Sequence, residues 1–202
     1  MADQLPKIGF WFEFASTYSY LSAMRIQRMA TTAGIGVAWH PFLLGPIFAA
    51  QGWNDSPFNI YPAKGRYMWR DLARRASQQG LPPIQRPAHF PQNGLLAARI
   101  ATIGASQMWG PDFVRGVFAA QFAKGADIGE PDVLTSVLND IGQPLSLLDQ
   151  ARSDPSIKDQ LRQTTDQAQT LGLFGAPSFT TQDKELFWGD DRLEDALAWA
   201  KR

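Results

Sequence analysis

Residues 10–22 read FWFEFASTYSYLS, and within this stretch a strand pattern passes directly into a helix pattern. From residue 7 to residue 14, apolar side chains recur at every second position, which is the period of a β-strand. Trp11 falls on the opposite face from Phe10 and Phe12. Both faces of this strand are therefore expected to be covered, as they usually are in a parallel sheet.

A βαβ unit is predicted around this junction. Apolar residues at helical spacings indicate a helix from about residue 18 to residue 33, and Gly34 suits its C-terminal end. The segment IGVAWHPF, residues 35–42, alternates again and predicts a second strand. A helix between two such strands is the sequence signature of a parallel strand pair.

The rest of the chain predicts a helical block, a hairpin and a last helix. Residues 43–170 carry helical patterns divided by glycine and proline clusters such as GPIF. The clearest predicted helices are AKGRYMWRDLARRASQQ, NGLLAARIATIG, PDFVRGVFAAQFAKG, EPDVLTSVLNDIG and DPSIKDQLRQTTDQAQTLG. Strand patterns return in GAPSFTT, residues 175–181, and in KELFWG, residues 184–189, before a C-terminal helix. This order predicts an α/β protein with a thioredoxin-like fold and an all-helical insertion. We expect residues 1–42 and 171–202 to form the thioredoxin-like domain and residues 43–170 to form the inserted helical domain.

The composition excludes several classes of function. Lys and Arg together number 19, as do Asp and Glu, so neither nucleic acid nor an anionic membrane surface is an expected partner. The chain has no cysteine, which excludes disulfides, thiolate metal sites and thiol chemistry by its own side chains. With only two histidines, His40 and His89, a metal site is not expected. The N-terminus lacks a secretory pattern and no apolar run reaches the roughly 20 residues that span a bilayer, so we expect a cytoplasmic protein.

Ser16 stands where the first strand ends and the helix begins. One interpretation is structural, because a serine N-cap accepts a hydrogen bond from a backbone N–H two or three residues on. The other is chemical, since a helix N-terminus favours an anion and the hydroxyl can donate to a bound thiolate. Such a hydrogen bond contributes about 1.5–3 kcal/mol, and about 1.4 kcal/mol lowers a pKa by one unit, so a bound thiol could ionise near neutral pH.

Two motifs near the C-terminus, GAPSF and WGDDRLE, carry further candidates. The bond before Pro177 is either an ordinary trans bond at a strand start or a cis bond, beside which the backbone N–H and C=O of Ala176 could pair with an extended peptide. Asp190 and Asp191 either cap the last helix, with Asp191 and Glu194 at capping-box spacing, or receive an ammonium group of a ligand.

A basic segment, NIYPAKGRYMWRD, covers residues 59–71 in the first part of the helical block. Lys64, Arg66 and Arg70 either form a solvated helix face or clamp carboxylates of a ligand. Asn59 could add a neutral hydrogen bond to such a clamp. Glu13 is expected to lie behind the ligand contacts or at the rim of a site rather than to act as an acid, and His40 is expected to be a packed structural histidine rather than a base.

Taken together, these motifs resemble a known family. FWFEFASTYSYLS is similar to the F-x-F-D-x-x-S-P-[YF]-S-Y-L opening of 2-hydroxychromene-2-carboxylate isomerases and kappa-class glutathione transferases, within the DsbA family of thioredoxin folds. The similarity continues, in order, through YPAKGRYMWRD, HFPQNGLLAAR, AKGADIGEPDVL, GLFGAPSF and LFWGDDRLE. It therefore covers nearly the whole chain.

The resemblance implies glutathione as a thiol cofactor and a homodimeric protein. On this basis Ser16 would be the catalytic residue and would hydrogen-bond the glutathione sulfur. Ala176, before a cis Pro177, would pair with the cysteinyl backbone of the cofactor.

The same resemblance implies residues for the two ends of glutathione. Asp190 and Asp191 would receive the γ-glutamyl end. Lys64 and Asn59 would lie near the carboxylates of the cofactor.

The isomerases of this family interconvert 2-hydroxychromene-2-carboxylate and trans-o-hydroxybenzylidenepyruvate in the catabolism of naphthalene-type aromatics. The implied mechanism is reversible addition of the glutathione thiolate to the conjugated system of the substrate. Because Thr17 replaces the usual proline and Glu13 the usual aspartate, a related ring-fission product is an alternative substrate. Alternative functions are a kappa-like glutathione transferase and a non-catalytic protein that binds a thiol peptide, whereas disulfide oxidoreductase activity is excluded by the lack of cysteine.

Overall fold

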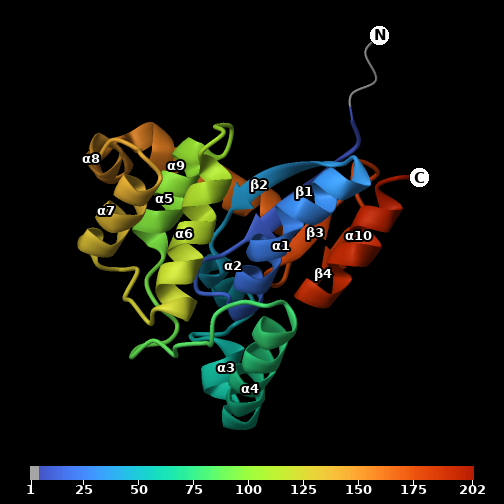
Figure 1. Ribbon diagram of the computed structural model, residues 1–202, viewed down its shortest axis with the longest axis horizontal. Helices are drawn as coiled ribbons and strands as arrows, with labels where there is room; N and C mark the ends of the chain where they lie inside the picture. Colours follow the sequence, from blue (N-terminus) through green and yellow to red (C-terminus); the bar gives the residue numbers. More distant parts are fainter. Residues whose placement is uncertain (1–4) are drawn as a thin grey trace.

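The computed structural model describes residues 5–202, so residues 1–4 of the predicted sheet domain lie outside it. Figure 1 shows a sheet with helices packed around it. Its strands are β1 (Lys7–Phe12), β2 (Gly36–Pro41), β3 (Ser178–Thr180) and β4 (Leu186–Trp188). Their order is β2-β1-β3-β4, with β1 parallel to β2 and β3 antiparallel to both of its neighbours. The predicted βαβ unit and hairpin are confirmed.

The helices follow the predicted order. Helix α1 (Thr17–Ala33) connects β1 to β2, and a 3-10 turn, η1 (Asp190–Arg192), leads from β4 into α10 (Leu193–Trp199). Between β2 and β3 the chain forms eight helices: α2 (Leu44–Ala50), α3 (Pro57–Ile60), α4 (Pro62–Gln78), α5 (Leu95–Gly104), α6 (Gly110–Ala123), α7 (Pro131–Asp140), α8 (Ser146–Ser153) and α9 (Pro155–Thr170). The α/β fold with an all-helical insertion is therefore present.

Three short helices, α2, α3 and α8, are absent from the sequence prediction. The cluster GPIF is predicted to separate helices, but it lies inside α2. Pro46 falls in the first turn of α2, where a backbone N–H has no partner within the helix, so proline is tolerated there. At this place the proline lies in the first turn of a helix rather than ending one.

Aromatic residues of β1 build the core on both faces of the sheet. Phe10 and Phe12 are completely buried, and the Trp39 ring contacts them edge-on at centroid distances of 5.0 and 5.9 Å. Full burial of such a side chain stabilises the fold by about 1.5–3 kcal/mol. On the opposite face Trp11, 2% exposed, packs in a second cluster with Phe42 and residues of α2 and α9. The sheet is thus covered on both faces, as predicted.

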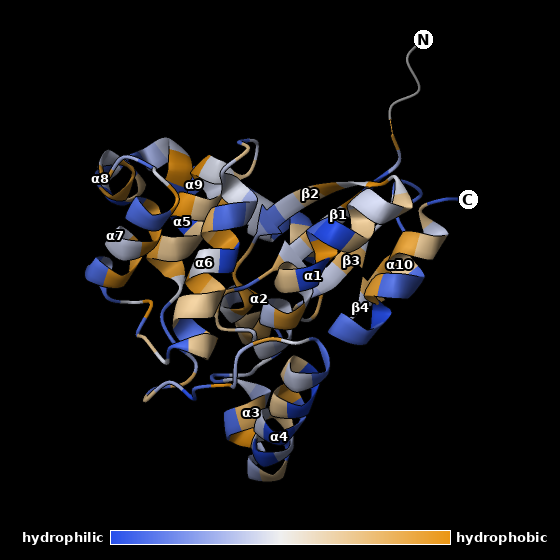
Figure 2. Cartoon of the chain, viewed as in Figure 1, coloured by the Kyte–Doolittle hydropathy of each residue, from blue (hydrophilic) through white to orange (hydrophobic). Residues whose placement is uncertain are grey.

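The helical insertion divides into two parts around the sheet. Helices α5 to α9 lie together as a bundle, whereas α3 and α4 stand apart from this bundle near the end of α1 (Figure 1). Figure 2 shows the difference in hydropathy, with hydrophobic colours dominating α5 and hydrophilic patches frequent on α4. A helix with less apolar surface is less fully buried. The exposed part of α4 therefore remains available, and it forms one wall of an open cavity.

Candidate active site

A cavity of about 910 Å³ opens where β1 ends and α1 begins. It is lined by the turn between these elements, by α2, by the α3–α4 pair, by the loop around residue 91, by residues 174–177 and by the segment leading into η1. The predicted site residues in its lining are Ser16, Lys64, Ala176, Pro177, Asp190 and Asp191. The fold therefore brings together residues from both ends of the chain and from the insertion.

A β-turn fixes the position of the first of these residues. The backbone N–H of Ser16 donates to the carbonyl of Glu13 at 2.9 Å, which closes the turn. Phe14, inside the turn, is 1% exposed and packs against Phe118 of α6 at a centroid distance of 5.1 Å. Because Phe14 anchors the turn in the core, Glu13 and Ser16 are held at the start of α1.

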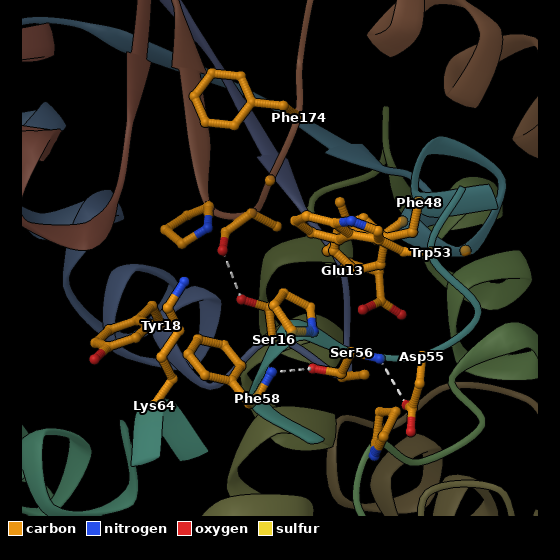
Figure 3. Close-up of a pocket in the computed structure, with 18 of the residues that line it drawn as sticks. Glu13, Ser16, Tyr18, Phe48, Trp53, Asp55, Ser56, Phe58, Lys64 and Phe174 are labelled. Carbon is orange, nitrogen blue, oxygen red and sulfur yellow. Dashed lines mark hydrogen bonds between the residues drawn. The ribbon is translucent and has the colours of Figure 1, made fainter. Parts of the chain in front are cut away.

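The Ser16 hydroxyl has two partners. Its oxygen accepts the backbone N–H of Ser19 at 3.2 Å, and its O–H donates to the carbonyl of Ala176 at 2.8 Å (Figure 3). The first bond confirms the N-cap interpretation. The second joins the start of α1 to the segment before β3, which lies 160 residues further along the chain.

Two more hydroxyls near this helix start are buried without a partner. Thr17 is 1% exposed and Ser19 is completely buried, and neither hydroxyl oxygen has a hydrogen-bond partner among residues 5–202. A buried polar group without a partner costs about 1–3 kcal/mol, and such groups are rare in native proteins. The turn region therefore contains polar capacity that the folded chain itself does not use.

The segment before β3 forms the opposite side of the cavity. The Ala176–Pro177 bond is cis. Ala176 is half-buried and Pro177 is buried. Phe174 and Trp188 stand at the cavity edge, 46% and 52% exposed, with ring centroids 4.8 Å apart. This edge presents an aromatic surface to solvent.

Asp190 lies in the cavity wall, at the centre of a charged cluster. Its residue is only 2% exposed. It accepts hydrogen bonds from the Ser22 hydroxyl at 2.9 Å and from the Arg25 guanidinium at 3.1 Å, while its other oxygen accepts from Arg75 at 2.8 Å. These partners occupy most of the acceptor capacity of the carboxylate.

Asp71 extends this cluster toward α1. It accepts the Tyr18 hydroxyl at 3.0 Å and lies 3.3 Å from the guanidinium of Arg75. Burial and the hydrogen bond to Asp71 raise the pKa of Tyr18, so this phenol keeps its proton at neutral pH. Asp71, Tyr18 and Arg75 all line the cavity.

The exposed predicted residues differ in how they are used. The Lys64 amine lies 4.9 Å from the centre of the Tyr61 ring, and within the described chain no carboxylate is close enough to pair with it. Lys64 extends beside Tyr18 into the cavity (Figure 3). Arg66 and Arg70 are exposed and do not line the cavity, as expected for a solvated helix face.

Asp191 and Asn59 have other partners. Partial burial acts to raise the pKa of Asp191, but the hydrogen bond from Arg192 at 2.9 Å, the positive charges of Arg192 and Arg75 and a backbone hydrogen bond together lower this pKa. The predicted capping box is wrong, because Arg192 is the N-cap residue of α10 and no side chain caps it. Asn59 is not in the cavity lining and instead donates to Asp55 and to the Phe90 carbonyl, each at 3.1 Å.

Glu13 is half-buried and points into the cavity beside Phe48 and Trp53 (Figure 3). Burial raises the pKa of Glu13 to about 7, and the backbone N–H of Ala15 acts in the opposite direction. No other side chain among residues 5–202 contributes to this shift. Glu13 is thus a carboxyl group that can gain or lose a proton near neutral pH.

His40 takes no part in the cavity. Its ring stacks on Trp11 with centroids 4.3 Å apart, and burial lowers the pKa of His40 to about 4. This confirms a packed, neutral histidine. No three acidic or histidine side chains gather as a metal site within residues 5–202. Within the same range, none of the helices has the length and apolarity to span a bilayer.

Sequence reasoning missed several lining residues. Asp71 and Arg75 follow Lys64 by about two and three helical turns, so the three residues share one face of the helix. This spacing could have identified Asp71 and Arg75 as lining residues from the sequence. Phe48 and Trp53 form an aromatic wall, with ring centroids 5.4 Å apart. Phe48 could not be placed because the short helix α2 carries no clear helical periodicity, and Trp53 lies in the loop that follows α2.

Comparison with curated proteins finds relatives of similar length. The 2-hydroxychromene-2-carboxylate isomerase of Sphingobium xenophagum is 29% identical over 189 residues, covering 93% of this chain and 94% of that protein. Glutathione S-transferase kappa 1 of Homo sapiens is 26% identical over 211 residues, covering 94% of this chain and 89% of that protein.

Solved structures share the fold. One of a 2-hydroxychromene-2-carboxylate isomerase has a TM-score of 0.86 at 24% identity, covering 97% of this chain and 96% of that one. The cytosolic disulfide reductase DsbM from Pseudomonas aeruginosa, solved with GSH, has a TM-score of 0.64 at 14% identity, with 96% of each chain covered. The family model described as DSBA-like thioredoxin domain matches residues 7–198. With nearly its whole length matched, the chain belongs to the family of DSBA-like thioredoxin domains.

Proposed function

We propose that this protein is a glutathione-dependent isomerase of 2-hydroxychromene-2-carboxylate or of a related aromatic ring-fission product. The observation that carries the proposal is Ser16, a hydroxyl at a helix N-terminus that faces a cavity in a chain without cysteine. Relatives named as such isomerases and as kappa glutathione transferases support it.

The cavity suits a thiol tripeptide together with a small aromatic acid. Its volume of about 910 Å³ lies at the upper end of the usual range for ligand sites. The amine of Lys64 has no carboxylate partner, which fits a ligand carboxylate. The proposed contacts are Ser16 with the sulfur, Ala176 and Pro177 with the cysteinyl backbone, Lys64 with a carboxylate, and Asp191, supported by the neighbouring Asp190, with the γ-glutamyl ammonium. Asn59 would act from behind the wall by holding Asp55 and Phe90.

When bound, glutathione supplies a sulfur nucleophile that adds to a conjugated double bond and later leaves it, so that this bond can rotate in between. In the free protein the Ser16 hydroxyl donates to the Ala176 carbonyl. A peptide N–H that pairs with this carbonyl releases the hydroxyl, which turns about its C–O bond toward the sulfur. Binding of the peptide backbone thereby makes the Ser16 donor available to the thiolate.

The chain also offers a surface for the aromatic substrate. Phe48, Trp53, Phe58 and Phe90 line the cavity on the side of α2 and α3. Flat rings pack well on such walls, and aromatic contacts contribute about 0.5–1.5 kcal/mol beyond the area they bury. A ring packed on these walls would also exclude water from the sulfur.

The proposal is tested by following the absorbance of 2-hydroxychromene-2-carboxylate with the protein, in the presence and absence of glutathione. We expect conversion only with glutathione. Ser16→Ala should lower kcat/KM about 10- to 100-fold, the equivalent of one charge-assisted hydrogen bond. Conversion that proceeds equally well without glutathione would contradict the proposal.

Asp154→Ala is the matched control for capping. Asp154 caps α9, accepting the Ser156 N–H at 2.8 Å, and it does not line the cavity. Both substitutions should cost about 1 kcal/mol of stability. Only Ser16→Ala should lower turnover. Equal turnover in the two variants would show that Ser16 acts only as a helix cap.

A kappa-like glutathione transferase is the second candidate, favoured by the similarity to the human kappa 1 enzyme. A transferase consumes glutathione and accumulates a conjugate, whereas an isomerase returns the cofactor unchanged. Thiol consumption measured during the same assay separates the two. Glutathione binding without either reaction would identify a non-catalytic binding protein. The cytoplasmic location and the homodimer stay predictions.

A further inference from the structure

Glu13 and Ser16 stand at the two ends of one tight turn. The hydrogen bond that closes this turn, 2.9 Å from the Ser16 nitrogen to the Glu13 oxygen, keeps the two Cα atoms within about 7 Å. Both side chains line the same cavity, and Figure 3 shows the Glu13 carboxyl directed into it. A ligand that reaches the Ser16 hydroxyl therefore lies in the same cavity as this carboxyl.

The surroundings leave the Glu13 carboxyl available to a ligand. Gln92 also lines the cavity, but its amide is occupied by the Ala126 carbonyl and the Ile128 N–H. Gly94 packs against Glu13, since a Cβ at this glycine would lie 3.8 Å from one carboxyl oxygen. Neither residue hydrogen-bonds the carboxyl within the described chain.

Charged and titratable side chains face this cavity from α1, from the loop before α3, from α4 and from η1. They are Tyr18, Asp55, Lys64, Asp71, Arg75, Asp190 and Asp191. None of them contributes to the pKa of Glu13, which burial alone raises to about 7. The lining residues from α2, including Phe48, are uncharged. The proton affinity of this carboxyl is therefore set by its half-buried position.

We propose that Glu13 shares a single proton with the sulfur of bound glutathione, an inference that rests on the proposed function. The Glu13 carboxylate takes the proton from the S–H bond and becomes a neutral acid. The electron pair left on sulfur forms the C–S bond, while the π pair of the substrate moves toward its conjugated carbonyl oxygen. When the C–S bond breaks and the double bond returns, Glu13 gives the proton back to sulfur.

Electrostatics favours this exchange. A thiolate and a carboxylate together would place two like charges in one partly enclosed site, which disfavours ionisation of both. Transfer of the proton keeps the site at one negative charge throughout. A carboxyl that titrates near 7 and a thiol near 8.5 are close enough for the proton to move in either direction.

The test counts the protons released when glutathione binds, by calorimetry at about pH 7.5 in two buffers of different ionisation enthalpy. In the wild-type protein the thiol proton moves to Glu13, so release should be close to zero. In Glu13→Gln it must leave to solvent, so release should rise by about 0.5 proton or more per glutathione. Glu13→Asp and Asp55→Asn should stay near the wild-type value, because each keeps the carboxyl at position 13.

Equal proton release by wild type and Glu13→Gln would overturn the inference while leaving the proposed function intact. Absence of glutathione binding to the wild-type protein would overturn both. If Glu13→Gln does not fold, infrared difference spectra of the wild-type protein decide the question. Glutathione should then produce the C=O band of a newly protonated carboxyl, and a spectrum without this band would contradict the shared proton.

Discussion

Two acids, Asp190 and Glu13, line the same cavity, but they differ in how many partners the fold provides for their carboxyl groups. Asp190 is 2% exposed and is held by a serine and two arginines. Glu13 is half-buried without a side-chain partner, and burial raises its pKa to about 7. A buried charge needs compensation by its neighbours, or else its proton affinity changes. Asp190 therefore stabilises the cavity wall, whereas the Glu13 carboxyl has no side-chain partner within the described chain.

The same contrast extends to hydroxyl groups one helical turn apart. Ser22 on α1 is completely buried and donates to Asp190 at 2.9 Å. Ser19, also completely buried, has no hydroxyl partner within the described chain, and neither does Thr17. Unsatisfied buried polar groups are rare in native proteins. The Ser22 hydroxyl thus supports the Asp190 cluster, whereas the buried hydroxyls of Thr17 and Ser19 have no partner within the described chain and do not line the cavity.

Removal of the partnered acid should have the largest effect on stability. Asp190→Ala leaves Arg25 and Arg75 without their shared carboxylate, so we expect a loss of about 3 kcal/mol in the free energy of unfolding. This is the low end for a broken buried pair, because the Arg75 side chain is 31% exposed. Urea denaturation measures the loss.

Asp191→Ala is the neighbouring control. Its side chain is 50% exposed and pairs with an equally exposed Arg192, so its removal should cost less than about 1 kcal/mol. Equal losses for the two variants would show that the Asp190 cluster does not support the fold as its geometry indicates.

The second effect concerns the pH dependence of stability. The pKa of Glu13 is raised in the folded state, so the folded protein binds this proton more tightly than the unfolded chain. The resulting stabilisation is complete below the unfolded pKa of about 4.3 and is lost as pH rises through about 7. Relative to Glu13→Gln, the wild-type protein should lose on the order of 2 kcal/mol over this range, a value discounted because the carboxyl faces an open cavity.

Denaturation of both proteins at several pH values checks this prediction. The difference between them isolates Glu13 from the other acids, which are common to both. Parallel stability curves would mean that Glu13 has an ordinary pKa in the folded protein. The contrast between the two acids would then disappear.

The predictable parts of this molecule depend on local pattern. The junction at Ser16 and the stop at Gly34, with φ of 71°, follow from periodicity and from the backbone conformation that glycine allows. The partners of Asp190 do not, because Arg25 and Arg75 are 165 and 115 residues away in sequence. A cluster assembled from three distant segments leaves no signal in any one of them. The resemblance supplied Asp190 as a candidate, but only the structure shows how fully its carboxylate is used.

The proposal that Ser16 holds a thiolate is tested most directly by a pH titration. The titration follows the ultraviolet absorbance of glutathione bound to the wild-type protein and to Ser16→Ala. The hydroxyl and the start of α1 should lower the pKa of the bound thiol by one unit or more from its free value of about 8.5. In Ser16→Ala most of this shift should be lost. A bound thiol that titrates at its free value in the wild-type protein would contradict the proposed role of this turn.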